Sequence, residues 1–379
     1  MAKRRAHGEG SIYQRKSDGL WIGTASVGWD DEGRRIRKTV SAKTRNDALA
    51  KLRVVQRHLE DGLPVPNASL TVEQLVERWY DEVLRHQVAM SAADNYRSIA
   101  KRHIYPTLGK KRLSNLTVGD VDRLISSKVD AGYSTSTVRR IRSILAQALD
   151  QAIRWGSVNR NVATLSRPPK QQRSEGRTMT PEEARTLLDA VKGHRNEALY
   201  ALMLSTGLRR GEALGLQWQD FDPKTGVLQI RRQLKREGGA LVTSDTKTAR
   251  SRRAVNLPTP MVATLKDHLV RQEREAAELG GAWQKSGFIF VTSVGTPMDP
   301  RNMYRDFQKI CNEAGLGNWH PHELRHSAAS LMLAQGVKLQ VVSEVLGHAS
   351  IRMTADVYGH ILDPDRQAAA DAMGSVLWE

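Results

Sequence analysis

The sequence has 379 residues, enough for two or three domains, and with 40% hydrophobic and 26% charged residues it can form a sizeable core. Lysine and arginine number 58 against 41 acidic residues, and the formal charge of +17 indicates a polyanionic partner, either nucleic acid or an anionic membrane. The single cysteine, Cys311, excludes an internal disulfide and any cysteine-based zinc cluster.

Two segments rich in proline, glycine and polar residues, 61–69 and 166–176, divide the chain. They predict domains at residues 1–62, 63–172 and 173–379. Basic residues outnumber acidic ones by 14 to 8 in the first, by 17 to 9 in the second and by 27 to 24 in the third. The first two parts therefore carry most of the excess positive charge.

The basic N-terminus lacks the apolar stretch of a signal peptide, and no window approaches the roughly 18 apolar residues that a membrane span needs, so we expect a soluble, intracellular protein.

Three strand-like runs lie between residues 11 and 40, with a turn at 31–33, and residues 44–59 have helical periodicity. These elements predict a small α+β module. Its basic residues could contact phosphates or form a solvated surface. They are Lys3, Arg4, Arg5, Arg34, Arg35, Arg37 and Lys38.

Residues 70–165 show only helix-period segments, which predict a unit of four or five helices. Thr117 and Ser136 stand where helix N-caps are expected, and Gly132 and Gly156 stand where helices should stop. The last long helix carries basic residues beside its apolar face, which could meet a duplex backbone or form a solvated edge. These are Arg139, Arg140 and Arg142.

The third part opens with the sequence Thr-Pro-Glu-Glu at residues 180–183, a capping box with proline at the first helical position. Helices dominate the rest of this part, and strand-like runs interrupt them at 227–234, 240–243 and 252–257. The chain has no Walker loop and no dinucleotide fingerprint, so we expect neither ATP nor NAD as a cofactor.

The segment from His322 to His326 matches the motif H-E-x-x-H, in which two histidines one helical turn apart bind zinc and the glutamate serves as a base. Arg325 would share the ligand face with His322, and a cation beside Zn²⁺ is electrostatically unfavourable. A zinc protease also has no use for the basic charge of this chain. The residues therefore favour a different chemistry, without a metal.

Phosphodiester chemistry suits the same segment. A phosphodiester under attack gains negative charge, which two arginines can stabilise through bidentate contacts to its oxygens. Arg209 and Arg325 each follow a predicted helix start, whose N–H groups would contribute to the same anion site. Glu212, three residues after Arg209, could hold its guanidinium in place. The alternative for Arg209 is an ordinary buried ion pair.

Four further residues could complete such a site. Tyr358 could attack phosphorus, since neighbouring cations favour a phenolate. Lys247 could deliver the proton that a leaving deoxyribose hydroxyl needs. His322 and His348 could donate hydrogen bonds to the phosphate or assist proton transfer, and Gly347 should place His348 at a helix end. Taken singly, the tyrosine and the histidines would more often be structural, so the hypothesis depends on their occurring together.

In this order, the motifs resemble those of the tyrosine recombinases, or phage integrases. That family has TGLR, a lysine in a β-hairpin, H-x-L-R-H, L-G-H and Y-x-H, which stand here at 206–209, Lys247, 322–326, 346–348 and 358–360. The middle part is similar to the family's core-binding domain at Tyr96, His103, Ile104, Leu108, Gly109 and Asn161, with Val162 where the family often has proline. The N-terminal module resembles the arm-type DNA-binding domains of integrases from actinobacterial phages and integrative elements.

The resemblance implies a multi-domain, mainly α protein with α+β parts. The three parts would be an N-terminal sheet with one helix, a helical core-binding bundle, and a mixed α/β catalytic domain of the tyrosine recombinase or type IB topoisomerase type. It also implies site-specific recombination through a 3′-phosphotyrosine and a Holliday junction, which integrates or excises a mobile element without metal or nucleotide. The implied catalytic residues are Arg209, Lys247, His322, Arg325, His348 and Tyr358.

The implied partners are double-stranded DNA attachment sites of core and arm type, further copies of the chain in a tetramer, and an accessory excisionase or host DNA-bending protein. The implied place of action is the cytoplasm of a bacterial host, with no membrane partner. The tail after Tyr358 ends in Val376, Leu377 and Trp378, which could pack on its own domain or on a neighbouring protomer.

Two rival functions stay open at this point. A type IB topoisomerase would use nearly the same residues but would relax supercoils without two specific sites. A non-catalytic DNA-binding regulator would keep its function after Tyr358→Phe.

Overall fold

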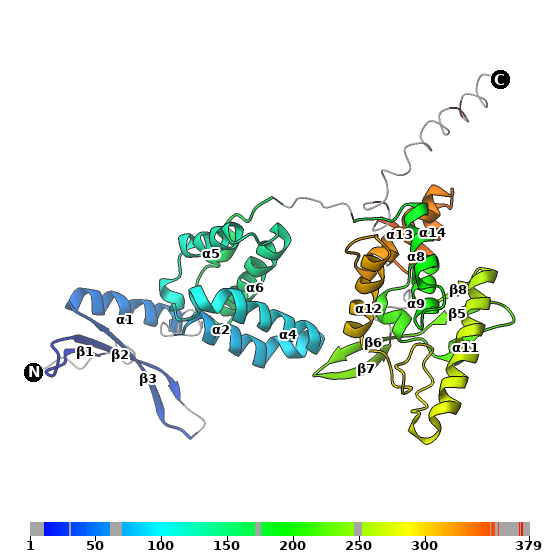
Figure 1. Cartoon of the computed structure of the whole chain (residues 1–379). Coiled ribbons are helices and arrows are strands. Elements are labelled where there is room, and N and C mark those ends of the chain that lie inside the picture. The colour runs from blue at the N-terminus through cyan, green and yellow to red at the C-terminus, as the bar shows by residue number, and fades with distance from the viewer. Residues whose placement is uncertain are drawn as a thin grey trace, which may run out of the picture. The chain divides into compact units, whose positions relative to one another are not determined.

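The computed structural model describes residues 11–29, 32–60, 70–170, 176–245, 252–348, 350–352, 355, 371 and 373 (Figure 1). The chain forms two compact units, which divide between Gln172 and Arg173. Across these described ranges, no helix combines the length and the apolar composition that a bilayer span requires.

The first unit begins with a three-stranded antiparallel sheet in the order β1, β2, β3, followed by one helix. The elements are β1 (Ser11–Gln14), β2 (Trp21–Trp29), β3 (Arg35–Ala42) and α1 (Arg45–Glu60). The two strands on either side of the turn predicted at 31–33, β2 and β3, pair as an antiparallel hairpin. Helix α1 packs Leu52 and Val55 against Ala25 on one face of the sheet. Gly23 permits this close approach, because a Cβ there would lie 3.4 Å from Leu52 Cβ on the helix, as well as 3.0 Å from Val40 Cγ2 on the neighbouring strand.

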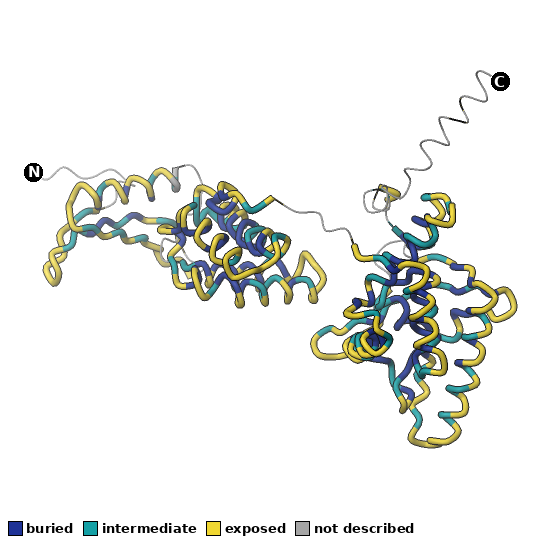
Figure 2. Tube along the Cα trace, turned by 45° about the horizontal axis from the view of Figure 1, so that its top comes forward, coloured by how far each residue is buried: buried dark blue, intermediate teal, exposed yellow. Residues whose placement is uncertain are grey.

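The rest of the first unit is a helical bundle, as the sequence predicted. Its helices are α2 (Val72–Trp79), α3 (Arg85–Gln87), α4 (Met90–Ile99), α5 (Val118–Asp130), α6 (Thr135–Arg154) and α7 (Val162–Leu165), with π-helical turns at Tyr80–Leu84 and Ala100–Gly109 and a 3₁₀ turn at Leu113–Asn115. Helix α6 buries eight residues among them, including Ile144 and Leu145. Each buried valine, leucine or isoleucine side chain among them contributes about 1.5–3 kcal/mol. Figure 2 shows the buried stretches of the chain in dark blue.

The helix ends of the bundle follow the expected signals with one exception. Thr117 caps α5 by accepting from the Asp120 amide, and Gly132 and Gly156 adopt φ of 78° and 64° just past the ends of α5 and α6. The prediction of Ser136 as the cap of α6 is wrong, because the helix begins earlier and Ser134 Oγ accepts from the Thr137 amide over 3.3 Å. Four hydroxyl residues, 134–137, stand in succession here, and only the first lies outside the helix.

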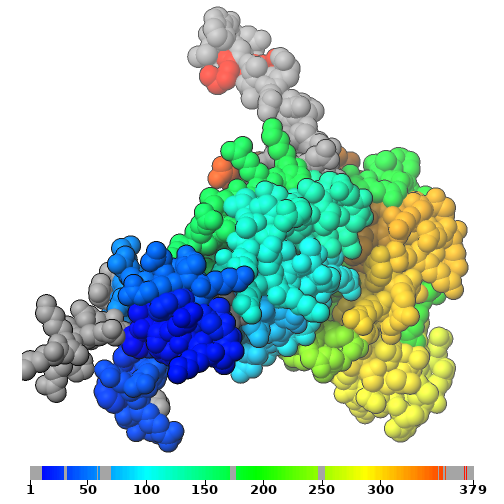
Figure 3. All heavy atoms as spheres, turned by 90° about the vertical axis from the view of Figure 1, so that its left-hand side faces the viewer, coloured from blue at the N-terminus to red at the C-terminus, as the bar shows by residue number. Residues whose placement is uncertain are grey.

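The second unit is mixed α/β. Its helices are α8 (Pro181–Val191), α9 (Glu197–Thr206), α10 (Arg210–Leu214), α11 (Thr259–Leu279), α12 (Pro300–Glu313), α13 (Pro321–Ala334) and α14 (Leu339–Leu346), with 3₁₀ turns at Trp218–Asp220 and Gly280–Ala282. Thr180 caps α8 in the predicted capping box. Helix α9 is buried almost throughout and packs against α8, α11 and α13. Helix α11 lies at the lower edge of this unit (yellow in Figures 1 and 3).

The strands of the second unit form two small sheets. One has the order β4 (Phe221–Asp222), β5 (Val227–Ile230), β8 (Arg253–Asn256), and the other pairs β6 (Arg232–Glu237) with β7 (Ala240–Asp245). The single run expected at 227–234 is therefore divided at Arg231. Beyond Arg231, strand β6 packs against the end of α10. The contact is so close that a Cβ on Gly215 would lie 2.9 Å from Gln233 Cα. Packing against the helix, which no local pattern shows, diverts the strand into a second sheet.

Cys311 lies in α12 with 0% of its surface exposed. Burial raises the pKa of its thiol to about 12, so the thiol stays protonated at neutral pH.

Candidate active site

Arg209 stands at the junction of α9 and α10. Gly207 ends α9 with φ of 65°, and Arg209 is the N-cap of α10. The predicted partner is confirmed, because Arg209 Nη1 lies 2.7 Å from Glu212 Oε1 and the Arg209 amide donates to Glu212 Oε2. Burial alone would raise the pKa of Glu212, but Arg253 and Arg209 outweigh it and hold the pKa below its ordinary value. Glu212 is thus an anion that orients an arginine.

Arg325 projects from the second turn of α13 and is only 4% exposed. Its Nη1 donates to the carbonyl oxygen of Gly207 over 2.9 Å. This bond brings the second predicted arginine to the segment that carries Arg209. Gly207 suits the position for two reasons, its positive φ and the absence of a Cβ, which would overlap the side chain of Leu346 in α14.

His348 follows the end of α14, as predicted. Gly347 has φ of 67°, and the His348 amide donates to Ser343 O over 3.0 Å, which reverses the chain at this point. Arg209 Nη2 donates to Gly347 O over 3.4 Å. Desolvation, followed by the charges of Arg325, Arg209 and Arg253, lowers the pKa of His348 to about 4. The imidazole is therefore neutral at pH 7, and the positive charges of three arginines disfavour its protonation.

His322 lies one turn before His326 on α13, and the two rings meet edge to face with centroids 5.0 Å apart. Desolvation, helped by His326, Arg325 and Arg209, lowers the pKa of His322 to about 4. Glu323 does not join these rings, because its Oε2 accepts from the His320 amide over 2.6 Å as part of a capping box. In the described residues, no group of three or more His, Cys, Asp or Glu is arranged to hold a metal ion.

Arg253 is a member of this cluster to which the sequence analysis gave no role. It lies on β8 with 8% of its side chain exposed, and its Nη2 donates to Glu212 Oε2 over 2.9 Å. Its Nε donates to Val345 O over 2.7 Å. One signal could have identified it: Arg253 is two residues from Val255 on a strand, so the two share the buried face.

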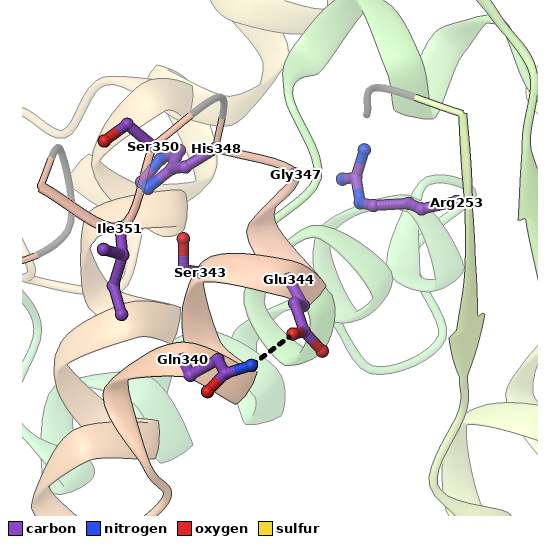
Figure 4. Close-up of a pocket in the computed structure, with 8 residues that line it drawn as sticks. All are labelled: Arg253, Gln340, Ser343, Glu344, Gly347, His348, Ser350 and Ile351. Atoms are coloured by element: carbon purple, nitrogen blue, oxygen red, sulfur yellow. Dashed lines mark hydrogen bonds between the residues drawn. The ribbon is translucent and has the colours of Figure 1, made fainter. Parts of the chain in front are cut away.

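A pocket of about 590 Å³ opens beside these residues (Figure 4). Its lining comes from β8, α14 and the chain just beyond α14: Arg253, Gln340, Ser343, Glu344, Gly347, His348, Ser350 and Ile351. In Figure 4 the side chain of Arg253 extends from its strand toward Gly347. Arg253, His348 and the acidic residue Glu344 border the pocket together.

The structure therefore brings together Arg209, Arg325, His322 and His348. Arg325 binds the carbonyl oxygen two residues before Arg209, Arg209 binds the carbonyl oxygen of the residue before His348, and His322 lies on the same helix as Arg325. Lys247 and Tyr358, which were expected to move the proton and attack phosphorus, lie outside the described residues.

The basic residues of the N-terminal module divide between the two faces of the sheet. Arg37 pairs with Ser26, and Arg35 donates to Ser26 Oγ over 2.9 Å, so both lie on the face away from α1. Lys38 instead pairs with Ala25, a core residue under α1. Lys3, Arg4 and Arg5 lie outside the described residues, and Arg34 precedes β3 and pairs with Glu32. The open face of the sheet thus presents two of the seven basic residues named from the sequence.

The three arginines of α6 all contact their own chain. Arg139 Nη1 donates to Pro169 O over 3.0 Å, and the guanidinium of Arg140 lies 4.3 Å from the ring centroid of Tyr96. Arg142 donates to Ser166 O and Thr164 O over 3.0 and 2.9 Å. Arg142 therefore holds the end of α7, a structural use that the sequence pattern did not indicate.

Residues 177–364 match the family model described as the phage integrase family, and residues 71–129 match that of the N-terminal SAM-like domain of phage integrases. An integrase of Streptomyces ambofaciens is 32% identical over 391 residues, which cover 99% of this chain and 98% of the relative. A XerC-like tyrosine recombinase of Caldanaerobacter subterraneus subsp. tengcongensis is 29% identical over 372 residues, covering 93% and 95%.

Solved structures share the fold. The integrase of the transposon Tn1549, in complex with a circular intermediate DNA, superposes with a TM-score of 0.68 at 19% identity, over 80% of this chain and 100% of that one. A lambda integrase tetramer bound to a Holliday junction gives 0.58 at 20% identity, over 94% and 96%. The predicted fold class is confirmed.

Proposed function

Since the chain belongs to the phage integrase family and is a tyrosine-type site-specific DNA recombinase, we propose that its second unit contains the site of strand cleavage. The proposed catalytic residues are Arg209, Lys247, His322, Arg325, His348 and Tyr358. The observation that carries the proposal is the pair of carbonyl contacts, Arg325 to Gly207 and Arg209 to Gly347, which join three motifs distant in sequence.

In this proposal the scissile phosphate lies between Arg209 and Arg325. Tyr358 attacks phosphorus, the bond from phosphorus to the 5′ oxygen breaks, and the DNA strand is left joined to the enzyme as a 3′-phosphotyrosine. Lys247 gives a proton to the leaving 5′ oxygen. The 5′ hydroxyl of a partner duplex then reverses the same steps, so that the number of phosphodiester bonds is conserved through a Holliday junction.

The charges of the site fit this division of work. Two fixed arginines stabilise the added negative charge of the transition state without any reorganisation. His322 and His348 are neutral at pH 7, so each can donate one N–H to a phosphate oxygen. The Glu212 carboxylate forms ion pairs with Arg209 and Arg253, so its negative charge is compensated and does not repel the phosphate.

We further propose that residues 1–62 bind arm-type DNA, that 63–172 bind core-type DNA and that 173–379 are catalytic. Separate hydrophobic cores in the N-terminal module and the helical bundle support the first boundary, and the division into two compact units supports the second.

Two rounds of exchange require four subunits, and the lambda integrase is a tetramer on a Holliday junction. We place the reaction in the cytoplasm of a bacterial host, on attachment sites that integrate or excise a mobile element, with an excisionase or DNA-bending protein as accessory factor.

The test is a nicked suicide substrate that carries a core site, from which the short fragment with the freed 5′ hydroxyl diffuses away. We expect a covalent protein–DNA adduct with the full-length chain and none with Tyr358→Phe. An adduct that persists in Tyr358→Phe would overturn the assignment of the nucleophile. Relaxation of a supercoiled plasmid that lacks attachment sites, at the rate seen with two sites, would instead identify a topoisomerase.

A further inference from the structure

Arg253 connects three parts of the second unit that lie far apart in the sequence. Its Nη2 binds Glu212 Oε2 over 2.9 Å, and the other oxygen of that carboxylate binds Arg209 over 2.7 Å. Its Nε binds Val345 O over 2.7 Å, three residues before His348. A single guanidinium on β8 therefore bonds both to the anion that orients Arg209 and to the end of the helix that presents His348.

The surroundings of Arg253 are built to hold it. The residue crosses Gly347 so closely that a Cβ at that position would lie 2.8 Å from Arg253 Nη1. Only 8% of the side chain is exposed, and Ile230 pairs with Arg253 in the β5–β8 ladder. The guanidinium is therefore held in a single position by two hydrogen bonds to backbone and carboxylate oxygens, by its contact with Gly347 and by the pairing of its strand.

The neighbouring arginine shows none of these features. Arg252 has 60% of its side chain exposed, and it pairs with Asp245, which is 75% exposed. An exposed pair of this kind contributes little to stability. Arg252 carries the same charge one residue away, so it is a matched control for the position of Arg253.

We propose that Arg253 is a positioning residue of the active site. Through its bonds to Glu212 and Val345 O, it fixes the positions of Arg209 and His348 relative to each other. The inference rests on the proposed function, because it concerns the site assigned there to strand cleavage. Arg253 acts through its neighbours and need not touch DNA. Its planar fork reaches two oxygens at once, whereas a lysine amine at the same place would reach one of them.

The experiment measures single-turnover cleavage of the suicide substrate at saturating DNA, with DNA affinity measured separately by fluorescence anisotropy. Arg253→Met is expected to lower the cleavage rate about 100-fold, the usual effect of misplacing a reacting group by an ångström, while DNA affinity stays as in the wild type. Arg253→Lys is expected to recover part of the rate. Arg252→Met is expected to cleave like the wild type once DNA saturates it.

A second readout separates positioning from a loss of folding. The charge of Arg253 is one of the causes that lower the pKa of His348. An NMR titration of His348 should therefore show a higher pKa in Arg253→Met and the original value in Arg253→Lys, which keeps the charge. If Arg253→Met does not fold, the lysine variant alone decides, with a slower cleavage rate at an unchanged His348 pKa.

Three outcomes would overturn the inference: wild-type cleavage in both Arg253 variants, an equal loss of cleavage rate in Arg252→Met, or a loss confined to DNA affinity. Failure of the proposed function looks different. In that case the wild-type chain itself forms no adduct, or Tyr358→Phe still forms one.

Discussion

Arg325 donates a hydrogen bond of 2.9 Å to the carbonyl oxygen of Gly207, a residue 118 positions earlier in the chain. The bond joins α13 to the end of α9, two residues before Arg209. It fixes the plane of a buried guanidinium relative to the second arginine of the site. Because the contact uses a backbone oxygen, its strength depends on the conformation at Gly207 and on no side chain there.

Arg325→Lys should abolish most of the cleavage activity and leave DNA affinity unchanged. A lysine keeps the charge, but it cannot donate to Gly207 O and to a phosphate oxygen in one plane. Loss of one such donor to a developing anion costs about 10²–10³-fold in rate. Adduct formation on the suicide substrate checks the rate, and a gel-shift titration checks binding. A parallel loss of affinity would contradict the assignment.

Gly347→Ala should both destabilise the protein and slow cleavage. Gly347 has φ of 67°, and an alanine Cβ would press on Arg253 Nη1 at 2.8 Å. The left-handed backbone alone costs about 1–2 kcal/mol for a residue with a Cβ. Gly315→Ala is the matched control, since Gly315 also follows a helix end, has φ of 71° and has open space around its Cβ position.

Denaturant titration of both glycine variants measures this difference. The Gly315 variant should lose only the backbone contribution and should cleave normally, whereas the Gly347 variant should lose more stability and cleave slowly. Equal losses of stability in the two variants would show that the contact between residue 347 and Arg253 does not contribute to the free energy of unfolding.

The free energy of unfolding should fall as pH decreases from about 6.5 toward 4, in part because of two half-buried histidines, His322 and His348. The pKa values of His322 and His348 are about 4 in the folded protein. In this window the unfolded chain binds protons at these residues and the folded chain does not, so protonation favours unfolding. The contribution is fully present above the ordinary histidine pKa and is lost below the folded one.

His348→Asn should therefore make stability less dependent on pH between 7 and 5. Urea unfolding at several pH values measures this slope, with the wild type as reference. A core-site duplex should have the opposite effect on the histidine, because a bound phosphate favours the imidazolium and raises its pKa. An unchanged slope in the variant would contradict the neutral state assigned to His348.

Arg37→Ala should weaken binding to arm-type DNA and leave cleavage of a minimal core site intact. Arg37 lies on the open face of the N-terminal sheet, and each lost phosphate contact reduces the salt dependence of binding by about one unit of slope. Arg53→Ala, an exposed position on α1, is the control with the same charge change. Equal effects of both variants would indicate that only net charge matters.

Local signals in the sequence were sufficient for most helix ends and for the motifs of the site. Thr117, Thr180 and Gly347 act within one turn of their own position, so their roles follow from neighbouring residues alone. The division of the strand at Arg231 depends on Gly215 lying against Gln233, a contact between elements that no periodicity contains.

Arg253 and Lys38 show a related limit. Which face a strand residue occupies depends on register, and register is decided by the partner strand as well as by the residue itself. Lys38 stands opposite Ala25 beneath a helix, although the charge pattern grouped it with Arg37. Arg253 lies among basic residues that look interchangeable in sequence, and its ion pair with Glu212 spans 41 positions.

The buried thiol of Cys311 makes this chain convenient for spectroscopy. It is the only cysteine in the sequence, it is inaccessible, and it stays protonated at neutral pH. A maleimide dye should thus leave the native protein unlabelled under conditions in which an introduced, exposed cysteine reacts fully. Single-molecule fluorescence of a labelled variant can accordingly be undertaken without first removing a native cysteine.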